Sequence, residues 1–536
     1  MSSNLRNNLP FLLLVLGISS YILYFSLFGI MRYEKLYAHY FDLGIMQQTV
    51  YNTYQGIKTR DMSRILEVTD PLGSTQQVKR MAIHNDVFLL FLAPFYFIHD
   101  GPATLLVIQS VILGLGAYAV FLITQAVFNK EKYADYFAVI FAYGYLLYPP
   151  LQKANNFDFH AVTLATTFLL AMYYFWMKKK YGLSLAFAIM SILTKEQVGL
   201  TVAFFGIYAI INSYTSHTQF SFASLKKHIV QLGSVHKLSI FIKKNDLCFG
   251  LGILSIGLIW VAVSMFVIIP YFRMGDHFGT KYFSYLSNAP WKAIPVIFRY
   301  ETIHYASLLL APLGFLSLFA PFQLLIALPD AVMNILADND NMRNIYFHYG
   351  SVITPFIFIS AIYAAHSFIT TKFEVLRNVV GFIVDRFELP KKSLKKFVCI
   401  INNPEKTIMY VLVGAIAVSS LYMSPLPWGH HRDMYPWHPF PAKYQDIKLW
   451  KMYLEDDMIK VSSTGHLAPH FASRRYFYNF AEGYDDASYV VIDRHDITRG
   501  FQSDLKYTEY QNILRDFRYI KMYDTNGIEV FKRLKN

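Results

Sequence analysis

A single carboxylate, Asp42, stands in the stretch FDLGIMQQTVYNT (41–53), just after the first long apolar run of the chain. The apolar residues Leu43, Met46, Val50 and Tyr54 follow it at three- and four-residue spacing, which predicts one stripe of an amphipathic surface helix. An acid at this place can cap the helix N-terminus, or it can act as a general base that takes a proton from an attacking hydroxyl or amine. Both roles remain open, and we select Asp42 as the candidate catalytic residue.

Two His–Asp pairs supply further polar groups. Asp158 and His160 lie in NFDFHA (156–161), and His84 and Asp86 lie in MAIHND (81–86). Residues two apart point to the same side only where the chain is extended. Such pairs can cap the start of a membrane span, or they can bind substrate. Nitrogen and oxygen donors together also leave open a divalent metal (Mg or Mn), although the spacing matches no strong metal motif, and no cofactor is predicted with certainty.

Charged residues also interrupt apolar sequence in ILTKEQVGL (192–200), at Lys195 and Glu196. Ionisable groups at such depth are costly, and they usually face a cavity or each other. The pair therefore forms a mutually neutralising turn, or Lys195 binds a lipid phosphate. Arg343 and His348 in NMRNIYFHYG (341–350) are a second candidate phosphate-binding pair, with ordinary loop polarity as the alternative.

Apolar helices must position these groups, as the composition indicates. Hydrophobic residues make up 54% of the 536 residues and charged residues 16%, against roughly 25% in typical soluble domains. The sequence predicts an α-helical polytopic membrane protein with about 11 transmembrane helices. The predicted spans are 9–31, 103–127, 134–149, 161–177, 182–194, 197–213, 247–269, 303–319, 321–337, 350–370 and 407–423.

Basic loops predict the orientation. They lie at 129–132, 178–180, 226–244 and 372–396. Positive loops stay in the cytoplasm, so we expect a multi-pass protein of the cell membrane with a cytoplasmic N-terminus and an extracytoplasmic C-terminus. The net charge of +13 is thereby explained without nucleic acid. The segment 84–101 is short, and counting it as a span would turn two basic loops outward. It is therefore predicted as an interfacial helix in the first outer loop, 32–101.

Two regions follow from this pattern: a membrane domain over 1–424 and an extracytoplasmic domain over 425–536. The second region opens with a Pro- and aromatic-rich linker. Strand-like runs follow at MIKVSST, SYVVID, YIKMYD and GIEVFKR, together with the helical pattern KYTEYQNILRDF. They predict a small α/β domain. Its stretch with His466, His470, Arg474 and Arg475 is predicted to dock over the membrane site.

The order of these segments resembles a family of predicted prokaryotic membrane proteins, domain of unknown function 2079. The segments are FDLGIMQQTVYNT, HNDVFLLFLAPFYFI, NFDFHAVTLATTFLLA, LTKEQVGL, the stretch ending in NMRNIYFHYG, and GHLAPHFASRRYFY. The layout is similar to that of class C (GT-C fold) glycosyltransferases, which use polyprenyl-phosphate sugars. The resemblance implies Asp42 as the base, Asp158 in a second functional loop and Lys195 as a phosphate ligand. Unlike those enzymes, the first loop has no paired acids and no DxD motif.

The expected function is that of an integral-membrane glycosyltransferase, a hexosyl or pentosyl transferase acting with inversion. Its partners would be membrane lipid, a polyprenyl-phosphate sugar donor and a glycan, lipid or protein acceptor at the extracytoplasmic face. Two alternatives stay open: a membrane transporter or lipid flippase, and a non-catalytic envelope-assembly scaffold. Transporters often carry internal repeats, and no repeat is visible in this sequence.

Overall fold

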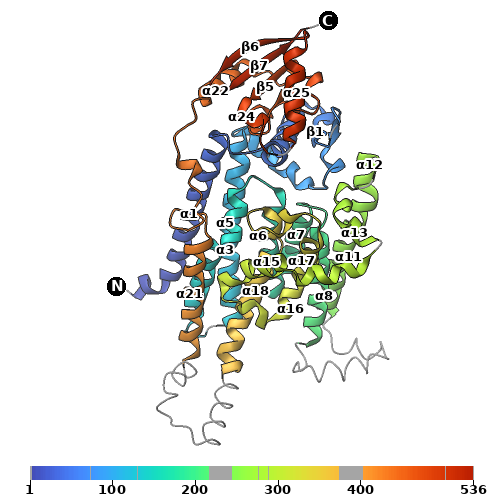
Figure 1. Cartoon of the computed structure of the whole chain (residues 1–536). Helices are drawn as coiled ribbons and strands as arrows, with labels where there is room; N and C mark the ends of the chain where they lie inside the picture. Colours follow the sequence, from blue (N-terminus) through green and yellow to red (C-terminus); the bar gives the residue numbers. More distant parts are fainter. Residues whose placement is uncertain are drawn as a thin grey trace, which may run out of the picture.

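The computed structural model describes residues 3–534 except 73, 130, 216–243, 276, 288, 374–402 and 501. The chain is mostly helical, and a five-stranded sheet stands at one end of the helices (Figure 1). The helices that precede the C-terminal region are α1 Ser3–Glu34, α2 Ile45–Thr59, α3 Pro102–Phe128, α4 Ala134–Leu146, α5 Pro149–Asn156, α6 Ala161–Met177, α7 Tyr181–Ile192, α8 Val198–Thr215, α11 Lys244–Val263, α12 Ile269–Arg273, α13 Ser284–Ser287, α14 Ala293–Phe298, α15 Tyr300–Leu310, α16 Pro321–Leu324, α17 Leu328–Leu336, α18 Thr354–Ser367 and α21 Pro404–Met423.

Several of these helices are apolar enough to cross a membrane, which confirms the predicted helical membrane fold. Within the described ranges, 5 helical stretches also have the necessary length: Asn8–Glu34, Pro102–Phe128, Asn245–Arg273, Thr354–Thr371 and Pro404–Met423. Other predicted spans are covered by shorter apolar helices. The predicted spans 303–319 and 321–337 are broken into short helical pieces. Proline supplies no backbone N–H, and Pro312, Pro321 and Pro329 lie at these breaks.

Two of the four basic loops used for the orientation fall almost entirely outside the described residues. They are the loops 226–244 and 372–396, of which residues 226–243 and 374–396 are not described. The cytoplasmic N-terminus and extracytoplasmic C-terminus therefore remain predictions from charge.

Close backbone contact joins α8 to α11. A Cβ atom on Gly206 would lie 2.5 Å from the Leu254 nitrogen, and one on Gly257 would lie 2.4 Å from the Gly199 oxygen. Only glycine allows the two backbones to approach so closely, as small residues commonly do between membrane helices. This packing fixes the helix pair that borders the apolar cavity described below.

Residues 32–101, predicted as the first outer loop and called the first outer segment below, contain the predicted interfacial element. Residues 84–101 include a 3₁₀ helix, η4 (Val87–Phe97), that buries Leu89 and Leu92 and leaves Phe91, Phe95 and Phe97 exposed. An element with one buried and one exposed apolar face suits the membrane surface.

Helix α2 differs from the surface helix expected from its apolar stripe. The stripe is buried, but Gln47 and Gln48 on the polar side are buried as well. Gln48 Nε2 donates to the Arg475 carbonyl at 3.0 Å, and Gln47 Nε2 donates to Ser473 Oγ at 2.8 Å. The C-terminal region thus covers the polar face of α2, which the local pattern of residues 43–54 could not reveal.

The C-terminal region is the predicted small α/β fold. Its helices and strands are α22 Tyr444–Tyr453, β3 Val461–Ser463, α23 Ala468–Phe471, β4 Phe477–Asn479, β5 Tyr489–Asp493, α24 Arg494–Ile497, α25 Ser503–Arg515, β6 Tyr519–Thr525 and β7 Ile528–Arg533. The sheet order is β4-β3-β5-β7-β6, with β3 parallel to its two neighbours and β7 antiparallel to β5 and β6. All four predicted strands are present, and only the three-residue β4 was not predicted. The first outer segment carries its own hairpin, β1 Glu67–Thr69 with β2 Gln77–Lys79.

The predicted docking stretch of the tail contacts the first outer segment, and Figure 1 shows β1 beside the C-terminal region. The imidazole Nε2 of His470 lies 2.9 Å from the Tyr33 carbonyl oxygen, and Nδ1 of His466 lies 3.3 Å from that of Ala38. Arg475 donates from Nε to the Glu67 carboxylate at 3.0 Å. Polar contacts therefore hold the tail against the end of α1 and the segment that follows it.

Acidification is expected to weaken this contact. Burial, and the nearby Lys451, lower the pKa of His470 from 6.5 to about 3. The unfolded chain takes up this proton below about pH 6.5, whereas the folded chain resists it, so stability is complete above that pH and falls as the pH drops toward 3. Thermal unfolding of detergent-purified protein should show a falling midpoint across this range, and the slope should be shallower for His470→Gln. An equally steep slope in the variant would contradict the assignment.

Candidate functional site

A polar cavity of about 350 Å³ lies among residues 41–86, 160–162, 194–195, 281–282 and 348–349. Most of the residues selected from the sequence line it: Asp42, His84, Asp86, His160, Lys195 and His348. They come from the first outer segment, the α5–α6 connection, the α7–α8 turn and the turn before α18. Four segments far apart in the sequence thus contribute to one hollow.

Asp42 lies in a π-helical turn, η1 (Tyr40–Gly44), before α2. Its Oδ1 is 3.1 Å from Nε2 of His160, and the Asp42 side chain is 22% exposed. The His160 ring stacks on His348 with 3.8 Å between ring centroids. Burial, and the adjacent His160, lower the pKa of His348. The carboxylate thus borders the cavity beside an imidazole that can orient it or share its proton.

Lys195 occupies the turn between α7 and α8 and is bordered by the Tyr349 ring, whose centroid is 6.0 Å from Nζ. Within the described part of the chain, no carboxylate lies within 4.0 Å of Nζ. Burial lowers the pKa of Lys195. A lysine held in this way is available to an anion that enters the cavity.

Glu196 does not pair with Lys195. Its Oε1 is 2.8 Å from Nδ1 of His84 and 3.3 Å from Nε2 of His277, and its Oε2 accepts the Asn85 N–H at 2.9 Å. Burial opposes the charge, but the two imidazoles hold the pKa of Glu196 well below its usual range. Of the two readings of Lys195 and Glu196, the mutually paired turn is thus not the arrangement observed.

Arg80 lines the same cavity and was not predicted. Its Nε and Nη2 donate to the two oxygens of Asp86 at 2.9 and 2.7 Å, and both residues are buried. Lys281, an exposed residue of the 3₁₀ helix η6 (Phe278–Phe283), also lines the cavity. The available signal was weak: Arg80 precedes the selected His84 and Asp86 closely, but only the fold shows that it faces the same space.

Asp158 and Arg343 are engaged outside the lining of this cavity. Asp158 is 1% exposed, forms an ion pair with Arg32 and accepts the His39 N–H at 3.0 Å. Arg343 pairs with Asp340 and donates to the carbonyls of Ile335 (at 3.3 Å) and Ala337, at the C-terminal end of α17. These contacts engage both side chains within the fold and away from the cavity.

Removing the Asp158 carboxylate should destabilise the protein strongly. The Asp158→Ala variant leaves the Arg32 guanidinium buried without its partner, which typically costs about 3–5 kcal/mol. We expect a clear drop in the unfolding midpoint of the purified protein. Asp135→Ala is the matched control, because that exposed acid accepts a hydrogen bond from Gln125 at 2.8 Å and forms no ion pair within the described residues. Equal midpoints for the two variants would contradict this role.

An apolar cavity of about 240 Å³ adjoins the polar one. The two share four lining residues: His84, Lys195, Tyr282 and Tyr349. The rest of its wall holds apolar residues that include Leu200 of α8, Val261 of α11, Met265 and Met333 of α17. It also holds polar groups from the α7–α8 turn and from the segment around η6, among them Glu196 and His277. A polar and an apolar hollow therefore meet at Lys195, which suits an amphiphile with an anionic head.

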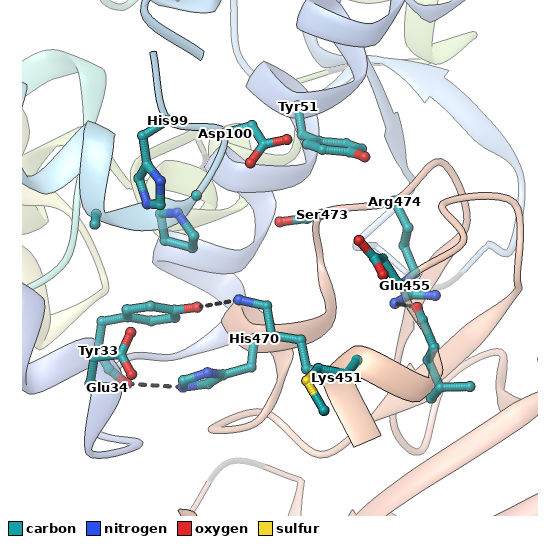
Figure 2. A pocket seen from close by; sticks show the side chains of 15 residues that line it. Tyr33, Glu34, Tyr51, His99, Asp100, Lys451, Glu455, His470, Ser473 and Arg474 are labelled. Atoms are coloured by element: carbon teal, nitrogen blue, oxygen red, sulfur yellow. Dashed lines mark hydrogen bonds between the residues drawn. The ribbon is translucent and has the colours of Figure 1, made fainter. Parts of the chain in front are cut away.

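A separate cavity of about 540 Å³ lies where the tail meets α1 and α3 (Figure 2). Lys451 Nζ donates to Tyr33 Oη at 3.3 Å across its wall. The Arg474 guanidinium is engaged by backbone carbonyls, among them that of Leu454 at 2.7 Å. This cavity shares no lining residue with the polar cavity of Asp42. It is part of the seam between the tail and the membrane part.

Comparison with known proteins places the chain as follows. The model of a family described as "Predicted membrane protein (DUF2079)" matches residues 32–530. Among solved structures, it is similar to ArnT from Cupriavidus metallidurans bound to undecaprenyl phosphate, with TM-score 0.46 and 10% identity over 96% of this chain and 97% of that one. It is also similar to the oligosaccharyltransferase AglB from Archaeoglobus fulgidus in complex with an inhibitory peptide and a dolichol-phosphate, with TM-score 0.39 and 12% identity over 99% and 75%. No curated protein sequence matches.

Proposed function

The chain belongs to the DUF2079 family of predicted membrane proteins, and from that premise we propose that it is an integral-membrane glycosyltransferase. It would move a sugar from a polyprenyl-phosphate donor to an acceptor at the extracytoplasmic face. The observation that carries the proposal is the joined pair of cavities, with Asp42 in the polar one and Lys195 at the boundary between the two.

Donor binding follows from that boundary. The apolar cavity would bind the first part of the polyprenyl chain beside α8 and α11. The donor phosphate would then lie at Lys195, whose ammonium is a compact point charge for a phosphate oxygen. Lys281 adds positive potential on the polar side, whereas Asp86 compensates for the charge of Arg80.

The transfer step assigns roles to the two groups. Asp42 would accept the proton of the acceptor hydroxyl or amine as that atom attacks the anomeric carbon. The bond between the anomeric carbon and the phosphate oxygen breaks, and both of its electrons leave with the polyprenyl phosphate. Lys195 would stabilise the negative charge that develops on this phosphate. A single displacement of this kind inverts the anomeric carbon.

A transfer assay tests the proposal. Purified full-length protein in lipid nanodiscs is incubated with undecaprenyl-phosphate-linked hexoses or pentoses labelled in the sugar, together with membrane extract as the acceptor source. We expect label to move to the extract and free undecaprenyl phosphate to accumulate in equal amount. If no donor loses its label, the proposal fails. Donor translocation in proteoliposomes that persists in an Asp42→Asn variant would instead indicate a flippase.

A further inference from the structure

We propose that His84, Glu196 and His277 form a binding site for one divalent transition-metal cation of the Zn²⁺ class. The three residues come from the first outer segment, the α7–α8 turn and the chain just before η6. Each offers one ligand atom, and these atoms all lie within 4.8 Å of one another.

The spacing suits a shared ion. Glu196 Oε1 is 2.8 Å from His84 Nδ1 and 3.3 Å from His277 Nε2. Metal–ligand bonds of about 2.1 Å place the ligands of one ion roughly 3 to 3.5 Å apart. The two imidazole nitrogens lie within 4.8 Å of each other, so a cation fits between the three atoms once the rings approach to that spacing.

Neighbouring contacts hold the carboxylate for this task. Glu196 Oε2 accepts the Asn85 N–H at 2.9 Å, which leaves Oε1 directed at both imidazoles. Such contacts outside the ligand set commonly fix the orientation of a metal ligand. The site is also reachable, because His84 borders both cavities and its side chain is 19% exposed.

The donor set selects the metal. Two imidazoles and one carboxylate suit Zn²⁺ and its neighbours, and three protein ligands leave at least one coordination position open. Mg²⁺ prefers oxygen ligands, so Mg, which the sequence left open beside Mn, fits these residues less well. The His84–Asp86 and Asp158–His160 pairs considered from the sequence do not form such a set, because Asp86 and Asp158 are paired with arginines.

Metal binding has one local cost at His277. Its Nδ1 accepts the Gly279 N–H at 3.0 Å. A ring bound to a metal through Nε2 carries its proton on Nδ1, so this hydrogen bond must open. We therefore expect faster hydrogen exchange of the Gly279 amide in the metal-loaded protein.

Metal content provides the test, because it needs no substrate. Tag-free, metal-depleted protein is titrated with Zn²⁺ by calorimetry and with Co²⁺ by visible spectroscopy. We expect one ion per chain and a Co²⁺ d–d spectrum for the wild type, and at least tenfold weaker binding for Glu196→Gln and for His277→Ala. Glu131→Gln is the matched control, since Glu131 forms another His–Glu pair, with His366 at 3.1 Å.

Two results would overturn the site: no ion bound by the wild type, or binding that survives Glu196→Gln. If a variant fails to fold, X-ray absorption on the wild type decides alone, because a shell without imidazole nitrogen contradicts the site. A role of the ion in holding the donor phosphate would rest on the proposed function. Because metal content is measured without the sugar donor, failure of the metal site would not contradict the proposed sugar transfer, and failure of sugar transfer would not contradict the metal site.

Discussion

The Asp42→Asn variant is expected to lose nearly all sugar transfer, with kcat reduced about 10²- to 10⁴-fold, the usual contribution of a positioned base. The amide keeps the size of the carboxylate but cannot accept the acceptor's proton. Donor affinity should change little, because the phosphate is assigned to Lys195. Initial rates at saturating donor, together with donor titrations, separate the two quantities.

Asp100→Asn is the control for this variant. Asp100 is an exposed acid of the same outer segment that does not line the polar cavity. Its transfer rate should match the wild type. A normal rate for Asp42→Asn, or an equal loss in both variants, would remove Asp42 from the chemistry.

The Lys195→Ala variant should bind undecaprenyl phosphate about 30- to 150-fold more weakly. This range corresponds to roughly 2–3 kcal/mol for a hydrogen bond to a charged group. The effect should fall on the phosphate, so polyprenol without phosphate should bind both proteins alike. Calorimetry or quenching of intrinsic fluorescence in nanodiscs measures the affinities.

Two further variants sharpen the Lys195 test. Lys195→Arg keeps the charge and should recover part of the affinity. Lys178→Ala removes an exposed lysine between α6 and α7, at the other end of α7 from Lys195, and should bind as the wild type does. Unchanged affinity in Lys195→Ala would show that the phosphate lies elsewhere.

Much of the fold could be predicted because its signals are local. Long apolar runs predict α1, α3 and α11, and short strand-like runs predict β3, β5, β6 and β7. The cover over the polar face of α2 could not be predicted, since it comes from residues more than 400 positions later, such as Arg475. The short pieces between Tyr300 and Leu336 depend on prolines whose effect in a membrane bundle varies with their neighbours.

The site shows the same division. Residue type and position near span ends identified Asp42, His160 and Lys195, which the structure brings to one cavity. Pairing was not predictable: Arg32 engages Asp158, Arg80 engages Asp86, and His277 reaches Glu196. Tertiary contacts determine each of these partners. A sequence indicates that a buried charge needs a counter-charge, but it does not show which residue supplies that counter-charge.

An electron cryomicroscopy map of the protein with undecaprenyl phosphate tests the central claim most directly. The proposed function predicts the phosphate within about 4 Å of Lys195 Nζ, the first isoprene units in the apolar cavity, and the Asp42 carboxylate facing the open polar cavity. A phosphate bound away from Lys195, or a lipid chain that leaves the apolar cavity empty, would contradict it.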